Sequence, residues 1–284
     1  MPSRPLPILI ASLAGCAGAT PLPPEAVEHN AAGAEALAGG RLDDAEARFR
    51  LALEYHPQFT EPRANLGLVA LERGDLPAAE SHLRGAIELN GDFAEAWANL
   101  GVVLERRGRD DGAREAYERA LSIQPGLVPA RRNLARLLVR TGRLGAARAH
   151  LMRLVQIEPS DLAARALLAH VELRLGRPAA AQVRAAAVLD EEPGHPVALL
   201  VRGVARAHRG DLDGAVRDLQ RLSDDPVVGR HARLRLAAVH ALRGERDRAR
   251  TLLAPLVAET PDDPAVQLVA CRVGPDRRRC PDLP

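Results

Sequence analysis

Small residues recur along this chain with a period of 34 residues. When units begin at residues 26, 60, 94, 128, 162, 196 and 230, position 15 is always glycine: Gly40, Gly74, Gly108, Gly142, Gly176, Gly210 and Gly244. Position 20 is always alanine: Ala45, Ala79, Ala113, Ala147, Ala181, Ala215 and Ala249. Position 24 is large in all units except the fifth, which has Ala185: Phe49, Leu83, Tyr117, Leu151, Leu219 and Leu253. This alternation of small and large apolar positions predicts seven copies of one structural unit.

Each unit is expected to hold two antiparallel helices. The glycine at position 15 permits the tight turn between them, because glycine adopts backbone angles that other residues avoid. Position 8 is also small, with glycine or alanine throughout, so that the paired helices can approach closely. Proline at position 32 ends the second helix at Pro57, Pro125, Pro159, Pro193 and Pro261. Strand patterns are missing, so the sequence predicts an all-α fold.

The stretch Phe93–Pro125 resembles a tetratricopeptide repeat (TPR). The residues that carry the resemblance are Trp97, Leu100, Gly101, Gly108, Ala113, Tyr117, Ala120 and Pro125. The resemblance implies a right-handed α-solenoid of seven TPR helix pairs over residues 26–263, followed by a C-terminal capping helix. The predicted units are 26–59, 60–93, 94–127, 128–161, 162–195, 196–229 and 230–263.

Two regions depart from the regular pattern. In the sixth unit proline comes one residue early, at Pro226, so an irregular seam is expected before the seventh unit. After the last unit, residues 264–284 are expected to form a capping helix over Ala265–Cys271 and a tail. Cys271 and Cys280 flank a Gly-Pro turn there, and we expect them to form a disulfide if the protein is exported, the alternative being two unpaired thiols.

The N-terminus has the features of an export signal. A short apolar run, Leu6–Ala14, follows Arg4 and is too short for a spanning helix, which needs about 20 residues. The sequence Leu-Ala-Gly-Cys ending at Cys16 resembles the lipobox of bacterial lipoproteins. That resemblance implies cleavage of a signal peptide, residues 1–15, and a lipid anchor on Cys16. Ala17 after the cysteine then implies an outer-membrane protein that faces the periplasm.

Residues 16–25 are rich in proline and glycine and are expected to form a flexible tether. Two alternatives remain for the N-terminus. One is an ordinary secretory leader with an accidental cysteine, and the other is an uncleaved N-terminus in the cytoplasm.

Composition and motifs argue against several other functions. All 39 positively charged side chains are arginine, yet the net charge is only +2, which gives no overall attraction to nucleic acid. The sequence has no HExxH, no GxSxG, no phosphate loop and no CxxC, and its histidines do not have metal-ligand spacing. Carboxylates at positions 16 to 19, such as Asp43 and Asp110, are interpreted as solvated helix starts. We therefore expect no catalytic residues, no metal, no cofactor and no enzyme activity.

The resemblance to TPR proteins implies that the first helix of each unit lines a concave groove. Its usual contact positions include 6, 9 and 13. Position 6 carries Asn65, Asn99 and Asn133, and position 9 carries Arg136. Position 13 carries Arg106, Arg140 and Arg174. The asparagines resemble the asparagine ladder of O-GlcNAc transferase, which implies hydrogen bonds to the backbone of an extended peptide. The arginines favour an acidic segment or a terminal carboxylate. The alternative is that asparagine is simply common at this position of the repeat.

These features together predict a non-catalytic scaffold for protein interactions in the cell envelope, with a protein or peptide partner and no nucleic acid. The combination of lipobox and repeats resembles pilotin lipoproteins of type IV pili, and equally TPR lipoproteins that act as adaptors for cell-wall enzymes. The alternatives are an accessory module that presents substrate to a catalytic partner, or a cytoplasmic TPR adaptor if the leader is not processed.

Overall fold

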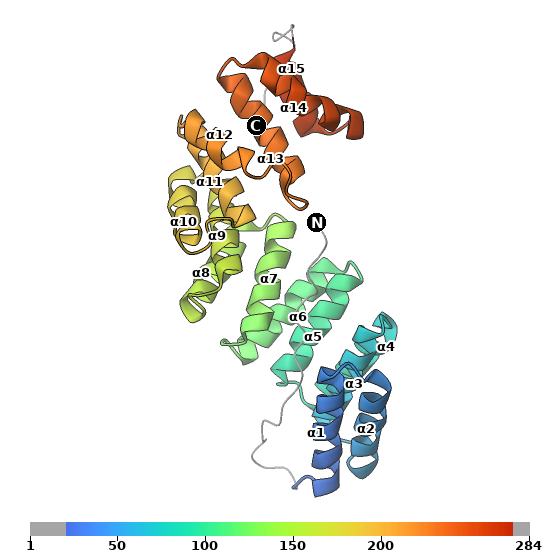
Figure 1. Cartoon of the computed structure of the whole chain (residues 1–284). Coiled ribbons are helices and arrows are strands. Elements are labelled where there is room, and N and C mark those ends of the chain that lie inside the picture. Colours follow the sequence, from blue (N-terminus) through green and yellow to red (C-terminus); the bar gives the residue numbers. More distant parts are fainter. Residues whose placement is uncertain (1–20, 275–284) are drawn as a thin grey trace. The chain divides into compact units, whose positions relative to one another are not determined.

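The computed structural model describes residues 21–274, which are helical throughout apart from turns and short connections and contain no strand. The helices in this range are α1 Pro24–Ala38, α2 Leu42–Tyr55, α3 Thr60–Glu72, α4 Leu76–Leu89, α5 Ala94–Arg106, α6 Asp110–Ile123, α7 Val128–Arg140, α8 Leu144–Ile157, α9 Leu162–Arg174, α10 Pro178–Glu191, α11 Pro196–His208, α12 Leu212–Gln220, α13 Gly229–Leu242, α14 Arg246–Glu259 and α15 Pro264–Val273. They form two compact bodies, which we call the N-terminal body (residues 21–150) and the C-terminal body (residues 151–274). Within each body, consecutive helices lie against one another in pairs (Figure 1).

The turns inside the pairs are made by the seven periodic glycines. Each has a positive φ, from 72° at Gly40 to 85° at Gly210. Among the described residues no other type of residue has a positive φ. The predicted reason for glycine at position 15 is therefore confirmed, since an L side chain is strained in this conformation.

Glycine at position 8 brings the two helices of a pair into close contact. A Cβ atom built on Gly101 would lie 2.5 Å from Cε1 of Tyr117 at position 24, and one on Gly67 would lie 2.7 Å from Cγ of Leu83. The same holds for Gly33 beneath Phe49 and for Gly203 beneath Leu219. These large side chains are fully buried. The size complementarity between positions 8 and 24 is thus what fixes the helix separation in these pairs.

A hydrogen bond links the start of most units to the end of the unit before it. The side chain at position 4 donates to the backbone carbonyl at position 32 of the preceding unit, as Trp97 Nε1 does to Gly91 at 2.9 Å. The other pairs are Arg63 with Pro57, Arg131 with Pro125, Arg165 with Pro159 and Gln267 with Pro261. These donors satisfy carbonyls at the ends of second helices, which have no partner within the helix.

The sixth unit shows how this link is kept when its usual donor is missing. Position 4 is Leu199 there, which has no polar hydrogen to donate. The carbonyl of Pro193 instead accepts from Arg221 Nη2 at 2.9 Å. A donor from the end of α12 therefore replaces the donor that the first helix lacks.

Ion pairs also join neighbouring units. Arg73, at position 14, pairs with Asp43 and Glu46 of the unit before it, and Arg107 pairs with Glu80. Arg243 pairs with Asp213 at 2.8 Å in the C-terminal body. Asp43 and Asp110 lie in the first turns of α2 and α6, as predicted, and arginines of the next unit also reach back to them.

The irregular seam in the sixth unit is confirmed. Helix α12 has 9 residues, whereas the second helix of each other unit has 14. The segment after it turns on Asp225, whose Oδ1 accepts from the backbone N–H groups of Val227 and Val228 at 2.8 Å each. Pro226 stands inside this turn at a position from which no backbone N–H donates to Asp225, so its lack of an N–H group costs no hydrogen bond of the turn.

The ends of the described region differ slightly from the prediction. Helix α1 begins at Pro24, so residues 24 and 25 belong to it and not to the tether. Proline suits the first helical position, because an N–H group there would have no acceptor within the helix. The predicted capping helix Ala265–Cys271 is α15, Pro264–Val273, with Asp263 capping its N-terminus. It starts one period after position 230 and packs on α13 and α14 as a first helix would.

Several predictions fall outside the described residues. These are the signal peptide, residues 16–20 of the tether including Cys16, and Cys280. Cys271 lies in α15, and its disulfide with Cys280 stays a prediction.

Candidate functional site

The three predicted asparagines occupy equivalent places on α3, α5 and α7. Asn65, Asn99 and Asn133 are buried, with 0 to 1% of their surface exposed. Asn65 Nδ2 donates to Asn30 Oδ1 of α1 at 3.2 Å, a bond across 35 residues of sequence. The row therefore includes a fourth buried asparagine. Asn30 stands at position 5 and not at position 6, which is why a search at fixed position missed it.

The predicted arginines have different environments. Arg140 donates to Asp110 Oδ2 at 2.8 Å and to Glu105 Oε1 at 3.0 Å, so both neighbours belong to the preceding unit. Arg106 donates to the carbonyl of Leu71 at 3.2 Å and thereby covers the end of α3. The structure thus engages these two side chains in contacts between units.

Arg136 differs from Arg140 and Arg106, since it forms no ion pair with any residue of the described chain. It is half-buried on α7. Burial and Glu105 raise the pKa of the Tyr117 phenol, and Arg136 lies close enough to oppose this rise. Tyr117 donates its hydroxyl to Glu105 at 3.2 Å. Arg136 is therefore a cation at the edge of the asparagine row that has no carboxylate of its own. Arg174 is an exposed residue at the end of α9, in the C-terminal body.

A network around Glu80 was not found from the sequence. This carboxylate, on α4, is approached by Arg84 of its own helix and by Arg107 and Arg109 of the next unit. Burial raises its pKa, but the three guanidinium groups outweigh burial and hold the pKa below its usual value. Glu80 stands at position 21, for which the repeat pattern alone gives no reason to expect a charge.

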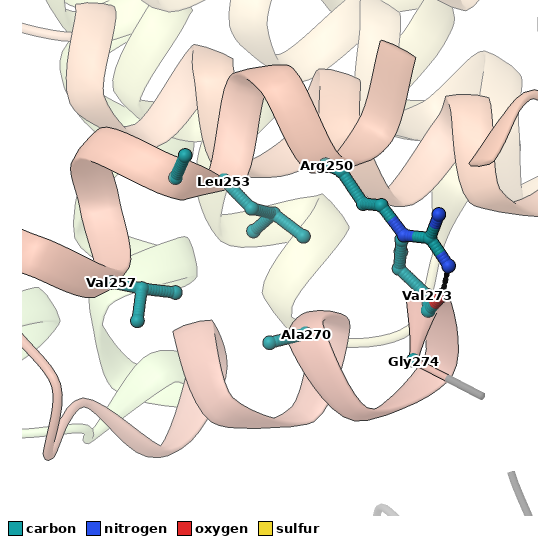
Figure 2. Close-up of a pocket in the computed structure, with 7 residues that line it drawn as sticks. Arg250, Leu253, Val257, Ala270, Val273 and Gly274 are labelled. Atoms are coloured by element: carbon teal, nitrogen blue, oxygen red, sulfur yellow. Dashed lines mark hydrogen bonds between the residues drawn. The ribbon is translucent and has the colours of Figure 1, made fainter. Parts of the chain in front are cut away.

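Two hollows lie away from the asparagine row. One, of about 320 Å³, opens between α14 and α15, where Leu253 and Val257 stand across from Ala270 (Figure 2). Arg250 closes one end of it by donating to the carbonyl of Val273 at 3.4 Å. The other, of about 200 Å³, lies among α2, α3 and α4, and its charged lining includes the paired Glu46 and Arg73. Neither lining brings a nucleophile together with a base, which acyl or phosphoryl transfer would require.

Metal and membrane sites were also sought in the part of the chain that the structure describes. Within residues 21–274 no three metal-binding side chains gather at one place. In the same range every helix is too short or too polar to cross a bilayer.

Comparison with protein families identifies the repeat. Models of the tetratricopeptide repeat match residues 30–88, 64–128 and 166–227, and a second such model matches residues 108–171 and 209–270. The chain belongs to the tetratricopeptide repeat family. TPR proteins are in general non-catalytic scaffolds that bind proteins or peptides. A search of curated proteins gave no match.

Solved structures show the same fold. YrrB, described as a TPR protein with an unusual peptide-binding site, is 24% identical with a TM-score of 0.60, over 65% of this chain and 96% of YrrB. PilF of Pseudomonas aeruginosa is 22% identical with a TM-score of 0.60, over 73% of this chain and 95% of PilF. PilW, a type IV pilus biogenesis factor, is 18% identical with a TM-score of 0.60, over 74% of this chain and 98% of PilW. At these identities the similarity shows the TPR fold alone.

Proposed function

We propose that this TPR protein is a non-catalytic scaffold that binds extended segments of partner proteins along α3, α5 and α7. The observation that carries the proposal is the row of equivalent amides, Asn65, Asn99 and Asn133, on three successive first helices. Asn65 already donates one amide N–H to Asn30, so a ligand has to exchange with bonds of this kind. The acceptor and the N–H donors of an amide match the alternating C=O and N–H groups of an extended backbone.

The burial of the row determines what kind of ligand it accepts. A buried amide that loses its hydrogen bonds costs roughly 1–3 kcal/mol. An occupant that reaches the row must therefore supply a donor or acceptor for every bond it displaces. A polypeptide backbone does this at each residue, whatever its side chains. The proposed site is for this reason tolerant of sequence and selective for extended chain.

Arg136 gives the site its preference for charge. Arg140 and Arg106 are occupied by contacts between units, whereas Arg136 has no carboxylate partner in the described chain. An acidic side chain or terminal carboxylate on the ligand would form a charge-assisted bond with it.

The proposed location is the outer membrane, with a lipid anchor on Cys16 and the repeats in the periplasm. The lipobox sequence supports the anchor, and several acyl chains at about 0.8 kcal/mol per buried methylene would hold the protein firmly. PilW, which shares the TPR fold, is a type IV pilus biogenesis factor, and a role of this kind in assembly is part of the proposal. Intact mass of the membrane fraction tests the anchor. We expect loss of residues 1–15 and a gain of acyl chains, and an unmodified mass that includes Met1 would contradict it.

Affinity capture from native membranes tests the binding role. The tagged full-length protein is crosslinked, and its partners are compared with those of Arg136→Glu and of the control Arg153→Glu. Arg153 is an exposed arginine on second helix α8. We expect Arg136→Glu to lose partners that wild type and Arg153→Glu retain. The same partners with all three proteins would contradict a site at the asparagine row.

The main alternative is an accessory module that presents substrate to a catalytic partner. The same capture separates the two functions. Recovery of a single enzyme, whose turnover rises when this protein is added, would favour the accessory module over an assembly scaffold.

A further inference from the structure

Three first helices of the C-terminal body are strongly basic. Helices α9, α11 and α13 lie side by side, since α11 contacts both of the others. Together they carry one carboxylate, Glu172. That side chain is buried and lies within 3.6 Å of Arg177 and Arg184 of the second-helix segment. The exposed side of the three helices is therefore left without an acidic residue.

Many of their basic side chains are already paired, and the acids that pair them come from second helices or turns. Arg202 and Arg206 both donate to Asp218 of α12, at 2.8 Å from their Nη atoms. The further pairs are Arg165 with Glu191, Arg230 with Asp263 and His240 with Glu245. These pairs neutralise the charges that face the second helices.

Four further basic side chains lie on α9 and α13. We call His170, Arg174, His231 and Arg235 the basic cluster. His231 and Arg235 are exposed on α13, and neither forms an ion pair with a residue of the described chain. The cluster lies on α9 and α13, the two first helices that contact α11. Burial lowers the pKa of His170, and so do Arg174, Arg235 and His231. All the charged groups that shift this pKa are basic.

Helix α11 lies between α9 and α13, and it carries apolar side chains next to the basic cluster. Its half-buried residues include Leu200 and Val204. A surface with cations on both flanks and an aliphatic strip between them repels basic ligands and suits a chain that alternates acidic with apolar side chains.

We propose that the basic cluster of the C-terminal body binds an acidic, partly apolar segment of a partner protein. The carboxylates of the segment pair with His170, His231 and Arg235, and its apolar side chains lie over Leu200 and Val204. This inference rests on the proposed scaffold function and adds a second site with a defined ligand chemistry, on a different body from the asparagine row.

Binding is coupled to protonation of His170. In the free protein burial, and then the neighbouring cations, lower the pKa of His170. A bound carboxylate reverses this effect, because it stabilises the imidazolium. The bound state therefore takes up a proton, and affinity rises as the pH falls toward the lowered pKa of free His170.

The test uses the full chain and two fluorescein-labelled peptides followed by anisotropy. One peptide alternates aspartate, leucine and serine, and the other replaces each aspartate by asparagine. We expect the acidic peptide to bind at least about fivefold more tightly. Arg235→Gln should weaken it roughly two- to fivefold, and the control Arg217→Gln, an exposed arginine on α12, should leave it unchanged. Binding should tighten between about pH 7 and pH 5, and less so in His170→Gln.

Each other outcome has a definite meaning. Equal binding of the two peptides, or equal effects of Arg235→Gln and Arg217→Gln, would overturn the inference. Binding to neither peptide would overturn it as well. Charge-dependent peptide binding with no partner captured from membranes would support this inference while contradicting the proposed scaffold function.

Discussion

Single atoms decide how closely paired helices approach. At Gly101 the nearest carbon of Tyr117 leaves no room for a methyl group, whereas nothing lies within 4 Å of the Cβ position of Gly145 on α8. Both residues are helical glycines, but Tyr117 stands opposite Gly101 whereas no atom stands opposite Gly145. The same substitution is therefore expected to have opposite effects at the two sites.

Gly101→Ala should lower the free energy of unfolding by roughly 1–3 kcal/mol, because Tyr117 has to move in a packed core. Gly145→Ala should raise it by about 0.4–1 kcal/mol, because alanine restricts the unfolded chain and suits a helix. Urea unfolding followed by circular dichroism measures both. Similar values for the two variants would mean that the contact between positions 8 and 24 does not determine helix separation.

Half-buried histidines make stability depend on pH. Burial lowers the pKa of His150, and Arg131, whose Nη1 lies 3.4 Å from its Nδ1, lowers it further. A lowered folded-state pKa means that the unfolded state binds more protons below the ordinary value of 6.5. The contribution of His150 is thus present above pH 6.5 and is lost as the pH falls below it.

We expect the free energy of unfolding to fall between about pH 7 and pH 5, by at most about 1.4 kcal/mol per pH unit for each such histidine. His150→Gln should reduce this slope, while Arg153→Gln on the same helix should not. Urea titrations across this range give the slope directly. An unchanged slope in His150→Gln would show that its protonation is the same in both states.

At the scale of elements, short links between units repeat with the period of the sequence. The donor at position 4 and the carbonyl at position 32 come from different units, and they meet in most of the chain. The sixth unit keeps the link with Arg221 in place of a position-4 donor. This replacement indicates that the carbonyl at position 32 needs a hydrogen-bond donor, which can come from a position other than 4.

Arg221→Gln should therefore destabilise the C-terminal body by about 0.5–1.5 kcal/mol, the typical value of one hydrogen bond. Arg217→Gln, on the same second helix, removes a charge without this bond and should change stability little. Comparison of their melting temperatures with that of wild type tests this point. Equal stability of all three proteins would mean that water satisfies the carbonyl of Pro193 equally well.

At the scale of the whole molecule, the described chain consists of two compact bodies. In repeat proteins each unit contacts its neighbours alone, so stability is a sum of local terms and distant parts need not unfold together. A destabilising substitution is then expected to act mainly on the body that contains it.

Gly203→Ala, which would place a Cβ atom 2.8 Å from Cγ of Leu219, provides the counterpart of Gly101→Ala. We expect hydrogen exchange to quicken mainly in residues 151–274 for Gly203→Ala and mainly in residues 21–150 for Gly101→Ala. Mass spectrometry of peptic fragments resolves the two regions. Uniform quickening in both variants would show that the chain unfolds as one cooperative unit.

The sequence by itself determined the helix pairs. Turn glycines, small residues at position 8 and the early Pro226 act through the chain's own backbone geometry or through contacts inside one pair, so a periodic pattern is enough to predict them. The same pattern carried the match to the TPR family.

The tertiary structure alone decided which polar groups meet between units. Arg140, which was predicted to contact a ligand, pairs with Asp110 and Glu105, and Asn65 bonds Asn30 from a different repeat position. These pairings depend on how far each helix is offset along its neighbour. The period fixes where a residue stands within its unit, but the offset between units arises from packing across the whole stack, and therefore only the structure could assign the partners.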